Sequence, residues 1–172
     1  MDLKAHIRQI PDFPKPGILF YDISTLLAHG PAWRETVDRV ADAVRAYRPD
    51  LLAAIESRGF IFAAPVAYQL NIGFTMVRKV GKLPGAVVSH AYDLEYGSDT
   101  LQVAEGLIPA GSRVVLIDDL LATGGTAQAA VELIRKVGAE VVGAVFLIEL
   151  MSLKGRARLS VPMTTLLGYE GG

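Results

Sequence analysis

Residues 114–126 read Val114-Val115-Leu116-Ile117-Asp118-Asp119-Leu120-Leu121-Ala122-Thr123-Gly124-Gly125-Thr126, the most informative stretch of the chain. Its first four residues are apolar and mostly β-branched, which is typical of an interior strand in a parallel sheet. Two carboxylates follow at once, and a Thr-Gly-Gly-Thr segment then opens a helical pattern. In open α/β sheets, ligands bind at the carboxyl ends of the strands. The stretch therefore predicts a ligand site between a strand and a helix.

The end of this stretch has the properties of a phosphate site. A helix start presents unpaired N–H groups and the positive end of the helix dipole, and both favour an anion. Glycines allow the backbone to approach closely, and threonine hydroxyls add hydrogen-bond donors. The predicted phosphate-binding residues are Ala122, Thr123, Gly124, Gly125 and Thr126.

The acidic pair, Asp118 and Asp119, would repel a phosphate, so it needs another partner. A ribose cis-diol offers two hydroxyl donors, and we expect the sugar to bind there. The alternative is an ordinary strand–helix turn in which the aspartates cap the helix. The stretch is not a nucleoside-triphosphate loop, because no Lys follows the glycines, and it lacks the G-x-G-x-x-G spacing of dinucleotide-binding folds.

Outside this stretch, short apolar runs alternate with segments of helical periodicity, and three prolines interrupt residues 11–17. The predicted helices are residues 2–10, Pro31 to just before Pro49, 60–70 (with Pro65 inside) and 126–137, and the predicted strands are 18–23 (strand or packed loop), 51–55, 73–77, 100–103, 113–117 and 141–148. This alternation predicts an α/β fold with an open, mainly parallel twisted sheet flanked by helices. Residues 79–99 show little periodicity, and a stretch of that length is usually functional or mobile.

Composition limits the class of protein. The 172 residues fit one domain, residues 1–172, with 51% hydrophobic content and a formal net charge of −1. Nucleic-acid-binding proteins are usually more basic, so we expect no nucleic-acid partner. No cysteine is present, which excludes disulfides and is compatible with a reducing cytosol. The N-terminus lacks an apolar signal region, and no apolar stretch approaches the roughly 20 residues of a membrane helix. We therefore expect a cytoplasmic protein without a membrane partner.

Two further segments carry local positive charge. Glu56-Ser57-Arg58-Gly59 ends a predicted strand, where Arg58 offers a fork of donors to an anion and Gly59 permits an unusual backbone. The alternative is a helix start capped by Ser57. Arg78, Lys79 and Lys82 form a basic cluster in a nearly neutral chain. Such a cluster is often a solvated loop face, but beside a phosphate site it attracts a polyanionic substrate.

Residues 114–126 resemble the motif that binds 5-phosphoribosyl-1-pyrophosphate (PRPP) in type I phosphoribosyltransferases, in the form of the branch that uses adenine. The resemblance extends over nearly the whole chain. The other similar segments are Phe13-Pro14-Lys15-Pro16-Gly17-Ile18-Leu19-Phe20, Glu56-Ser57-Arg58-Gly59-Phe60, Arg78-Lys79-Val80-Gly81-Lys82-Leu83-Pro84-Gly85, Leu94-Glu95-Tyr96-Gly97 and Glu149-Leu150-Met151-Ser152-Leu153-Lys154-Gly155-Arg156.

The resemblance implies a role for each segment. It implies the type I phosphoribosyltransferase fold with a small base-binding hood from about residues 1–30, a mobile loop at about 79–99 that contains Tyr96, and a homodimer. The 5′-phosphate would lie on residues 122–126. The implied pyrophosphate-binding residues are Glu56, Ser57, Arg58, Gly59, Arg78, Lys79 and Lys82, the base-binding residues are Leu19, Phe20 and Tyr21, and the catalytic residues are Glu95 and Arg58. Mg²⁺ would be held mainly by the substrate, with no direct protein ligand.

The implied reaction transfers a 5-phosphoribosyl group from PRPP to adenine and gives AMP and pyrophosphate, with Glu95 managing a proton of the purine. One alternative is another purine, namely hypoxanthine, guanine or xanthine. Enzymes for hypoxanthine and guanine usually carry Asp where this chain has Ala122, which argues against them. Tyr21 departs from the family pattern, which often has Arg there, and this bears on base specificity. Another alternative is a non-enzymatic PRPP-sensing regulator, which should add a DNA-binding segment or a broad basic face.

Overall fold

The structure is a computed structural model and describes residues 1–94 and 96–170. No helix among these residues has both the length and the apolar character that a membrane span requires. The elements are η1 (Leu3–His6), β1 (Arg8–Ile10), β2 (Phe20–Asp22), α1 (Ser24–Leu27), α2 (Gly30–Arg45), β3 (Leu51–Ile55), α3 (Gly59–Leu70), β4 (Gly73–Lys79), β5 (Val87–Asp93), β6 (Ser98–Ala104), β7 (Arg113–Leu121), α4 (Gly125–Lys136), β8 (Glu140–Leu150), η2 (Met151–Leu153), η3 (Gly155–Arg158) and β9 (Met163–Tyr169).

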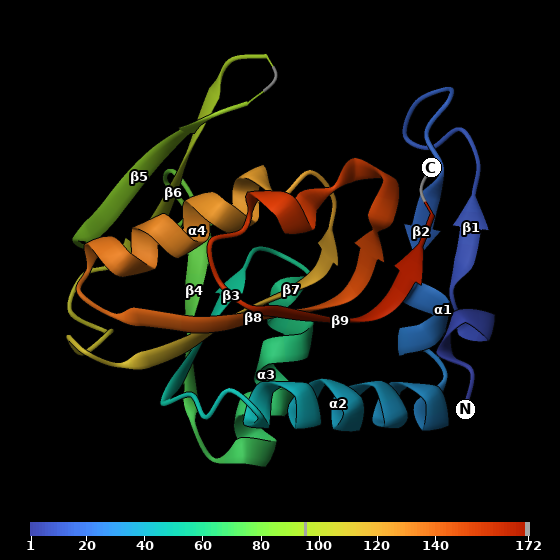
Figure 1. The fold of residues 1–172 in the computed structure, drawn as a ribbon, viewed down its shortest axis with the longest axis horizontal. Helices are drawn as coiled ribbons and strands as arrows, with labels where there is room; N and C mark the ends of the chain where they lie inside the picture. The colour runs from blue at the N-terminus through green and yellow to red at the C-terminus, as the bar shows by residue number, and fades with distance from the viewer. Residues whose placement is uncertain (95, 171–172) are drawn as a thin grey trace.

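The main sheet has the strand order β5-β6-β4-β3-β7-β8-β9 in the described part of the chain. The five strands β4, β3, β7, β8 and β9 are parallel, while β5 and β6 add an antiparallel ribbon at one end. Helices α2 and α3 cover one face and α4 covers the other (Figure 1). The predicted α/β fold with an open, mainly parallel sheet is therefore confirmed.

The central strands are buried on both faces, which explains their continuous apolar sequences. In β3, Leu52 and Ala54 pack into the cluster with α2 and α3, while Ala53 and Ile55 pack into the cluster with α4. Alternate side chains of a strand point to opposite faces, so both sets are removed from water. The sheet thus forms a rigid base from which the loops at its carboxyl edge project.

The N-terminal segment forms a small ribbon, β1 paired antiparallel with β2, which we call the hood. It packs at the β9 end of the sheet, where the Tyr21 ring lies 4.3 Å from that of Tyr169 and the Lys4 ammonium donates to the Gly168 carbonyl at 2.5 Å. The predicted helix over residues 2–10 is wrong beyond His6, because Arg8–Ile10 pairs with β2. Pairing with a distant strand has overridden the local helical spacing.

Residues 79–99 contain regular structure that the sequence did not predict, because they include strand β5 and the start of β6. Strand β5 pairs with β6 along its whole length, from Val87 with Ala104 to Asp93 with Ser98. Most side chains of β5 are only half-buried, so the strand lacks the clean apolar alternation that identifies strands in sequence. The ribbon projects beyond the body of the molecule at the end opposite the hood (Figure 1). Its mobility stays a prediction.

Candidate active site

An open pocket of about 440 Å³ lies at the carboxyl edge of the sheet, at the ends of β3, β4 and β7 and the start of α4. It brings together segments that are far apart in the sequence. Its lining includes Glu56, Ser57 and Arg58 after β3, Lys79 at the end of β4, Asp118 and Asp119 in β7, and Ala122, Thr123, Gly124 and Thr126 around the start of α4. The shared edge follows from the parallel strands, whose carboxyl ends all point the same way.

The predicted phosphate loop is held in shape by a close backbone contact. Gly124 has a φ of 85°, and a Cβ there would lie 2.7 Å from the carbonyl oxygen of Gly155. Helix α4 begins at Gly125, and its first hydrogen bond runs from the Gln128 N–H to the Gly124 carbonyl at 2.9 Å. The N–H groups of the first turn have no partner within the helix. The loop therefore presents backbone N–H donors to the pocket, in a conformation that requires a glycine at position 124.

The acidic pair lies between this loop and Arg58. The Asp119 carboxylate, 7% exposed, accepts a 2.6 Å hydrogen bond from Nε of Arg58, and its negative charge raises the pKa of that guanidinium. Asp118 accepts from the backbone N–H of Asp119 at 2.8 Å. Burial, and then the charge of Asp119, raise the pKa of Asp118 well above its usual range. One carboxylate is thus ion-paired and the other is held toward its neutral form.

Gly59 allows α3 to start directly against the end of β7. A Cβ at this position would lie 2.9 Å from the Ile117 carbonyl oxygen and 3.2 Å from the Asp118 carboxylate. Its φ is not in the left-handed region, so the expected reason for the glycine, an unusual backbone, is wrong. The reason is close approach, which sets Arg58 beside Asp119.

The basic side of the pocket is made mainly by Lys79. Its ammonium lies 3.2 Å from the Asp99 carboxylate, and the hydrogen bond to Asp99 raises the pKa of the lysine. Glu56 is directed at the end of β4, where it accepts from the Lys79 N–H at 2.5 Å and lies 3.7 Å from Nε of Arg78. Arg78 stacks on the Phe60 ring at 5.8 Å, and Lys82 is exposed in the turn after β4. Within the described residues, this pocket is lined by Lys79 but not by Arg78 or Lys82.

One aromatic ring of the hood lies beside Arg58, a residue of the pocket lining. Phe20 lies with its ring centroid 5.9 Å from the Arg58 guanidinium carbon and 5.1 Å from the ring of Phe13. Its neighbour Tyr21 points to the other face of β2 and is buried against Tyr169. Leu19 is half-buried and packs against the core. Of the predicted base-binding residues, Phe20 therefore lies beside Arg58, while the Tyr21 ring is a packing group.

Residues 24–162 match the sequence profile described as the phosphoribosyl transferase domain. The chain belongs to the phosphoribosyltransferase family. A relative from Rhodospirillum rubrum named adenine phosphoribosyltransferase is 62% identical over 170 residues, which are 99% of each chain, and one of the same name from Rhodospirillum centenum is 59% identical with the same coverage.

Solved structures agree with this assignment to the phosphoribosyltransferases. The adenine phosphoribosyltransferase of Thermoanaerobacter pseudethanolicus superposes with a TM-score of 0.94 at 44% identity, covering 98% of both chains. The Saccharomyces cerevisiae enzyme, solved in complex with an imino-altritol bisphosphate and adenine, has a TM-score of 0.90 at 40% identity, covering 96% of this chain and 97% of that one.

Two supports of this phosphoribosyltransferase site were not predicted as functional. Asp99 holds Lys79, and Gly155 lies under the phosphate loop. The segment containing Gly155 resembles the corresponding segment of the family, and in the structure it packs against the phosphate loop. Arg156 pairs with Glu149 at 2.8 Å, and this hydrogen bond lowers the pKa of the Glu149 carboxyl. The predicted catalytic residue Glu95 lies outside the described residues, and Tyr96 is 88% exposed.

Proposed function

We propose that this phosphoribosyltransferase converts adenine and PRPP to AMP and pyrophosphate. The observation that carries the proposal is the position of Arg58, which contacts Asp119 in the sugar pair at 2.6 Å and lies on the Phe20 ring of the hood. A base held on Phe20 is thereby adjacent to a ribose held on the acidic pair. The naming of the 59–62% identical relatives for adenine, and the adenine in the yeast complex, support this base.

The ribose and its phosphate are assigned to the wall formed by β7 and α4. Asp118 and Asp119 accept hydrogen bonds from the two ribose hydroxyls, since both are at the pocket lining and carboxyl oxygens are strong acceptors. The 5′-phosphate binds at the start of α4, on Ala122, Thr123, Gly124, Gly125 and Thr126. No lysine is needed there, because the helix start and its N–H groups supply the favourable field.

Pyrophosphate is assigned to the opposite wall. Ser57, Arg58 and Lys79 line the pocket and are the direct contacts that we propose. Gly59 permits the close packing described above, and Glu56 orients Lys79 and Arg78 through its carboxylate. Arg78, next to Lys79 in β4, and Lys82, in the turn after β4, do not line the pocket and contribute to the attraction of a polyanion.

Mg²⁺ is the cofactor that we propose, bound mainly through PRPP oxygens and water. Among residues 1–94 and 96–170, no group of three His, Asp or Glu side chains is arranged to hold a metal. Asp119 is already ion-paired and the pKa of Asp118 is raised, so this donor set fits a metal held by the substrate beside the pair rather than in a protein cage. When bound, the ion offsets negative charge on the departing pyrophosphate.

The bond from N9 of adenine to C1 of the ribose forms as the bond from C1 to the pyrophosphate oxygen breaks. Arg58 and Lys79 stabilise the charge that develops on the leaving group. The N9 proton must leave the base, and we assign its acceptor to the carboxylate of Glu95, which follows Leu94 in the sequence. Phe20 stacks on the purine, Leu19 and Tyr21 fix the hood by packing against the core, and Tyr96 covers the site from the ribbon.

We also propose that the protein is a homodimer and that it is located in the cytoplasm. Phe74 and Met76 in β4 and Val80 just after it are 36%, 42% and 60% exposed, and exposed apolar side chains grouped in this way are typical of a subunit interface. The chain contains no cysteine, which suits a reducing compartment. Light scattering of the purified protein should give twice the mass of the chain, and a monomer at micromolar concentration would contradict the dimer.

The proposed activity is tested by a PRPP-dependent assay across adenine, hypoxanthine, guanine, xanthine and orotate. We expect turnover with adenine, dependence on Mg²⁺, and AMP and pyrophosphate in equal amounts. Turnover of another purine in preference to adenine would reassign the base. No turnover of any of them, with PRPP still bound, would favour the PRPP-sensing regulator.

A further inference from the structure

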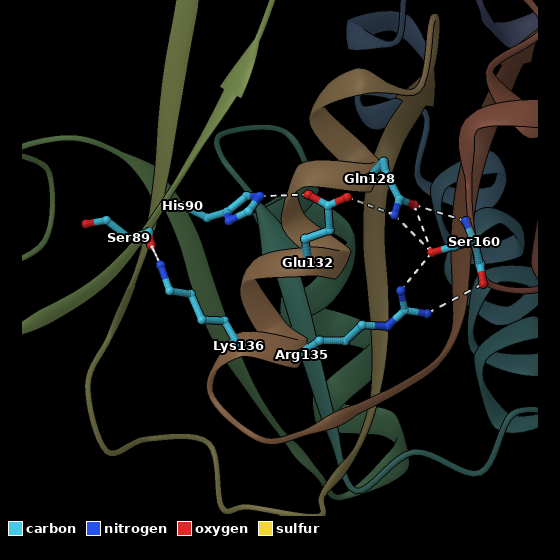
Figure 2. Close-up of polar contacts among 7 residues, drawn as sticks. All are labelled: Ser89, His90, Gln128, Glu132, Arg135, Lys136 and Ser160. Atoms are coloured by element: carbon cyan, nitrogen blue, oxygen red, sulfur yellow. Dashed lines mark hydrogen bonds and ion pairs between the residues drawn. The ribbon is translucent and has the colours of Figure 1, made fainter.

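The β5–β6 ribbon lies against the exposed face of α4, and side chains of the helix hold it there. Nε2 of His90 and the Glu132 carboxylate are 2.7 Å apart, and the Lys136 ammonium donates to the Ser89 carbonyl at 2.7 Å (Figure 2). The hydrogen bond from His90 lowers the pKa of Glu132. Glu132 and Lys136 are four residues apart and so share one side of the helix. Strand β5 is therefore docked at two points on α4.

The neighbouring side of α4 is fastened to the segment that follows η3. Gln128 donates to Oγ of Ser160 at 2.9 Å and accepts from its N–H at 3.0 Å, and Arg135 donates to the same hydroxyl at 2.9 Å (Figure 2). The side-chain amide of Gln128 also reaches Glu132 at 3.4 Å. Helix α4, which begins at the phosphate loop, is thus held in place by the ribbon on one side and by this segment on the other.

Tyr92 is the residue of the docked strand that reaches the phosphate loop. Its hydroxyl lies 3.2 Å from Oγ1 of Thr126, in the first turn of α4, and its ring is half-buried against the core cluster on that face. Across the ribbon Tyr92 pairs with Asp99, which holds Lys79 at 3.2 Å on the opposite wall. Tyr92 therefore contacts the start of α4 at the proposed 5′-phosphate subsite, and its strand partner Asp99 contacts Lys79 at the proposed pyrophosphate subsite.

We propose that Tyr92 is a positioning residue for the 5′-phosphate, which acts by orienting the Thr126 hydroxyl. A threonine hydroxyl has one proton to donate and can accept two hydrogen bonds. When Tyr92 donates to Oγ1, the Thr126 proton is directed to another acceptor, and the phosphate at the helix start is that acceptor. Without Tyr92 the hydroxyl is free to rotate toward another acceptor, such as the backbone carbonyl four residues earlier, to which threonine hydroxyls in helices can donate. The inference rests on the proposed function, because the phosphate is that of PRPP.

The test uses Tyr92→Phe, which removes only the hydroxyl, in the full-length protein. The control is Tyr68→Phe, since Tyr68 is 90% exposed on α3 and contacts neither subsite. Calorimetry measures the binding of ribose 5-phosphate, which carries only the 5′-phosphate, and of pyrophosphate, which occupies only the other wall. We expect Tyr92→Phe to weaken ribose 5-phosphate by about fivefold, the loss of one hydrogen bond, and to change pyrophosphate less than about twofold.

Each outcome decides the inference. Unchanged affinity for ribose 5-phosphate, or an equal loss for both ligands, would overturn it. If the unsubstituted protein binds no ribose 5-phosphate at all, the proposed function fails instead. Binding by the unsubstituted protein therefore distinguishes a failure of the proposed function from a failure of the role of Tyr92.

The docking of the ribbon is tested by conservative rescue at His90. His90→Leu removes the contact with Glu132 and should weaken ribose 5-phosphate binding by about twofold to threefold, because it releases the strand that carries Tyr92. His90→Gln keeps a donor at this position and should restore most of the affinity. Equal affinity in both variants would refute the positioning role of His90.

Discussion

Gly124→Ala should destabilise the protein strongly, whereas Gly125→Ala at the next position should not. At Gly124, φ is 85°, and a left-handed conformation costs an alanine about 1 to 2 kcal/mol. The new Cβ would also lie 2.7 Å from the Gly155 carbonyl oxygen and 3.2 Å from its Cα. Gly155 cannot retreat easily, because it packs closely against the Ala122 carbonyl and Leu121. The two effects together amount to about 2 to 4 kcal/mol.

Gly125 provides the matched control. Its φ is not in the left-handed region, and a Cβ there meets only the end of the Arg158 side chain, at 3.3 Å. That guanidinium is exposed and can move, and alanine is favoured over glycine in a helix by up to about 1 kcal/mol. We therefore expect a change below about 1 kcal/mol of either sign for Gly125→Ala.

Urea unfolding of the two variants measures this difference directly, and thermal unfolding should lower the melting temperature of Gly124→Ala by roughly 5 to 15 °C. Ribose 5-phosphate affinity should fall with stability in Gly124→Ala, since the same backbone forms the proposed phosphate site. Equal stability of the two variants would refute the steric argument, because it would mean that the backbone at Gly155 can move away from the new Cβ or that the loop has another conformation.

Three further outcomes follow from the site. Asp118→Asn should become more stable than the unsubstituted protein as pH rises. Because the pKa of Asp118 is raised in the folded state, its contribution to the free energy of unfolding is full below the ordinary pKa of 3.8 and is lost as the pH rises through the folded-state pKa. If urea unfolding gave a stability difference between the two proteins that did not change with pH, the raised pKa would be contradicted. Phe20→Ala should raise the KM for adenine roughly tenfold and that for PRPP less than about twofold in initial-rate measurements, and equal effects on both would remove Phe20 from the base site. Glu95→Ala should lower kcat by about 100-fold or more with a smaller effect on PRPP binding, and full activity would exclude Glu95 from the proton transfer.

The parts of the fold that could be predicted are those buried on both sides or on one clear face. Strand β3 was predicted with its observed bounds, and β7, β8, α2, α3 and α4 within a few residues, because their apolar patterns match the packing they enter. Pro65 did not end α3, since the buried residues around it hold the helix against the sheet.

The parts that could not be predicted are held by contacts with distant segments. Strands β1 and β5 are short or half-exposed, and each is fixed by a partner strand rather than by its own pattern. Strand β9 was not predicted at all, because five of its seven residues are only partly buried and its sequence shows no clear alternation. Pairing with β8 makes it a strand.

The residues gathered at the site were predictable, whereas the direction of several side chains was not. Their positions after parallel strands place them at one edge, so sequence order alone brings them together. No sequence pattern states that Glu56 faces β4, that Tyr21 packs on Tyr169, or that Arg58 joins the hood to the acidic pair. These contacts join segments far apart in the chain and depend on the final packing.

Two carboxylates beside a phosphate site would repel the phosphate, but the environments of Asp118 and Asp119 reduce their negative charge. At an effective dielectric constant of about 20, two unit charges about 4 Å apart interact by about 4 kcal/mol, so two free carboxylates would oppose PRPP strongly. Asp119 is compensated by Arg58 at 2.6 Å, and burial together with Asp119 shifts Asp118 toward its neutral form by raising its pKa. Both groups keep oxygens for the ribose hydroxyls while presenting little net charge to the phosphates. The same argument explains why Arg58 is paired before substrate arrives: a pocket with a bare acidic pair would repel the ligand that it is shaped to hold.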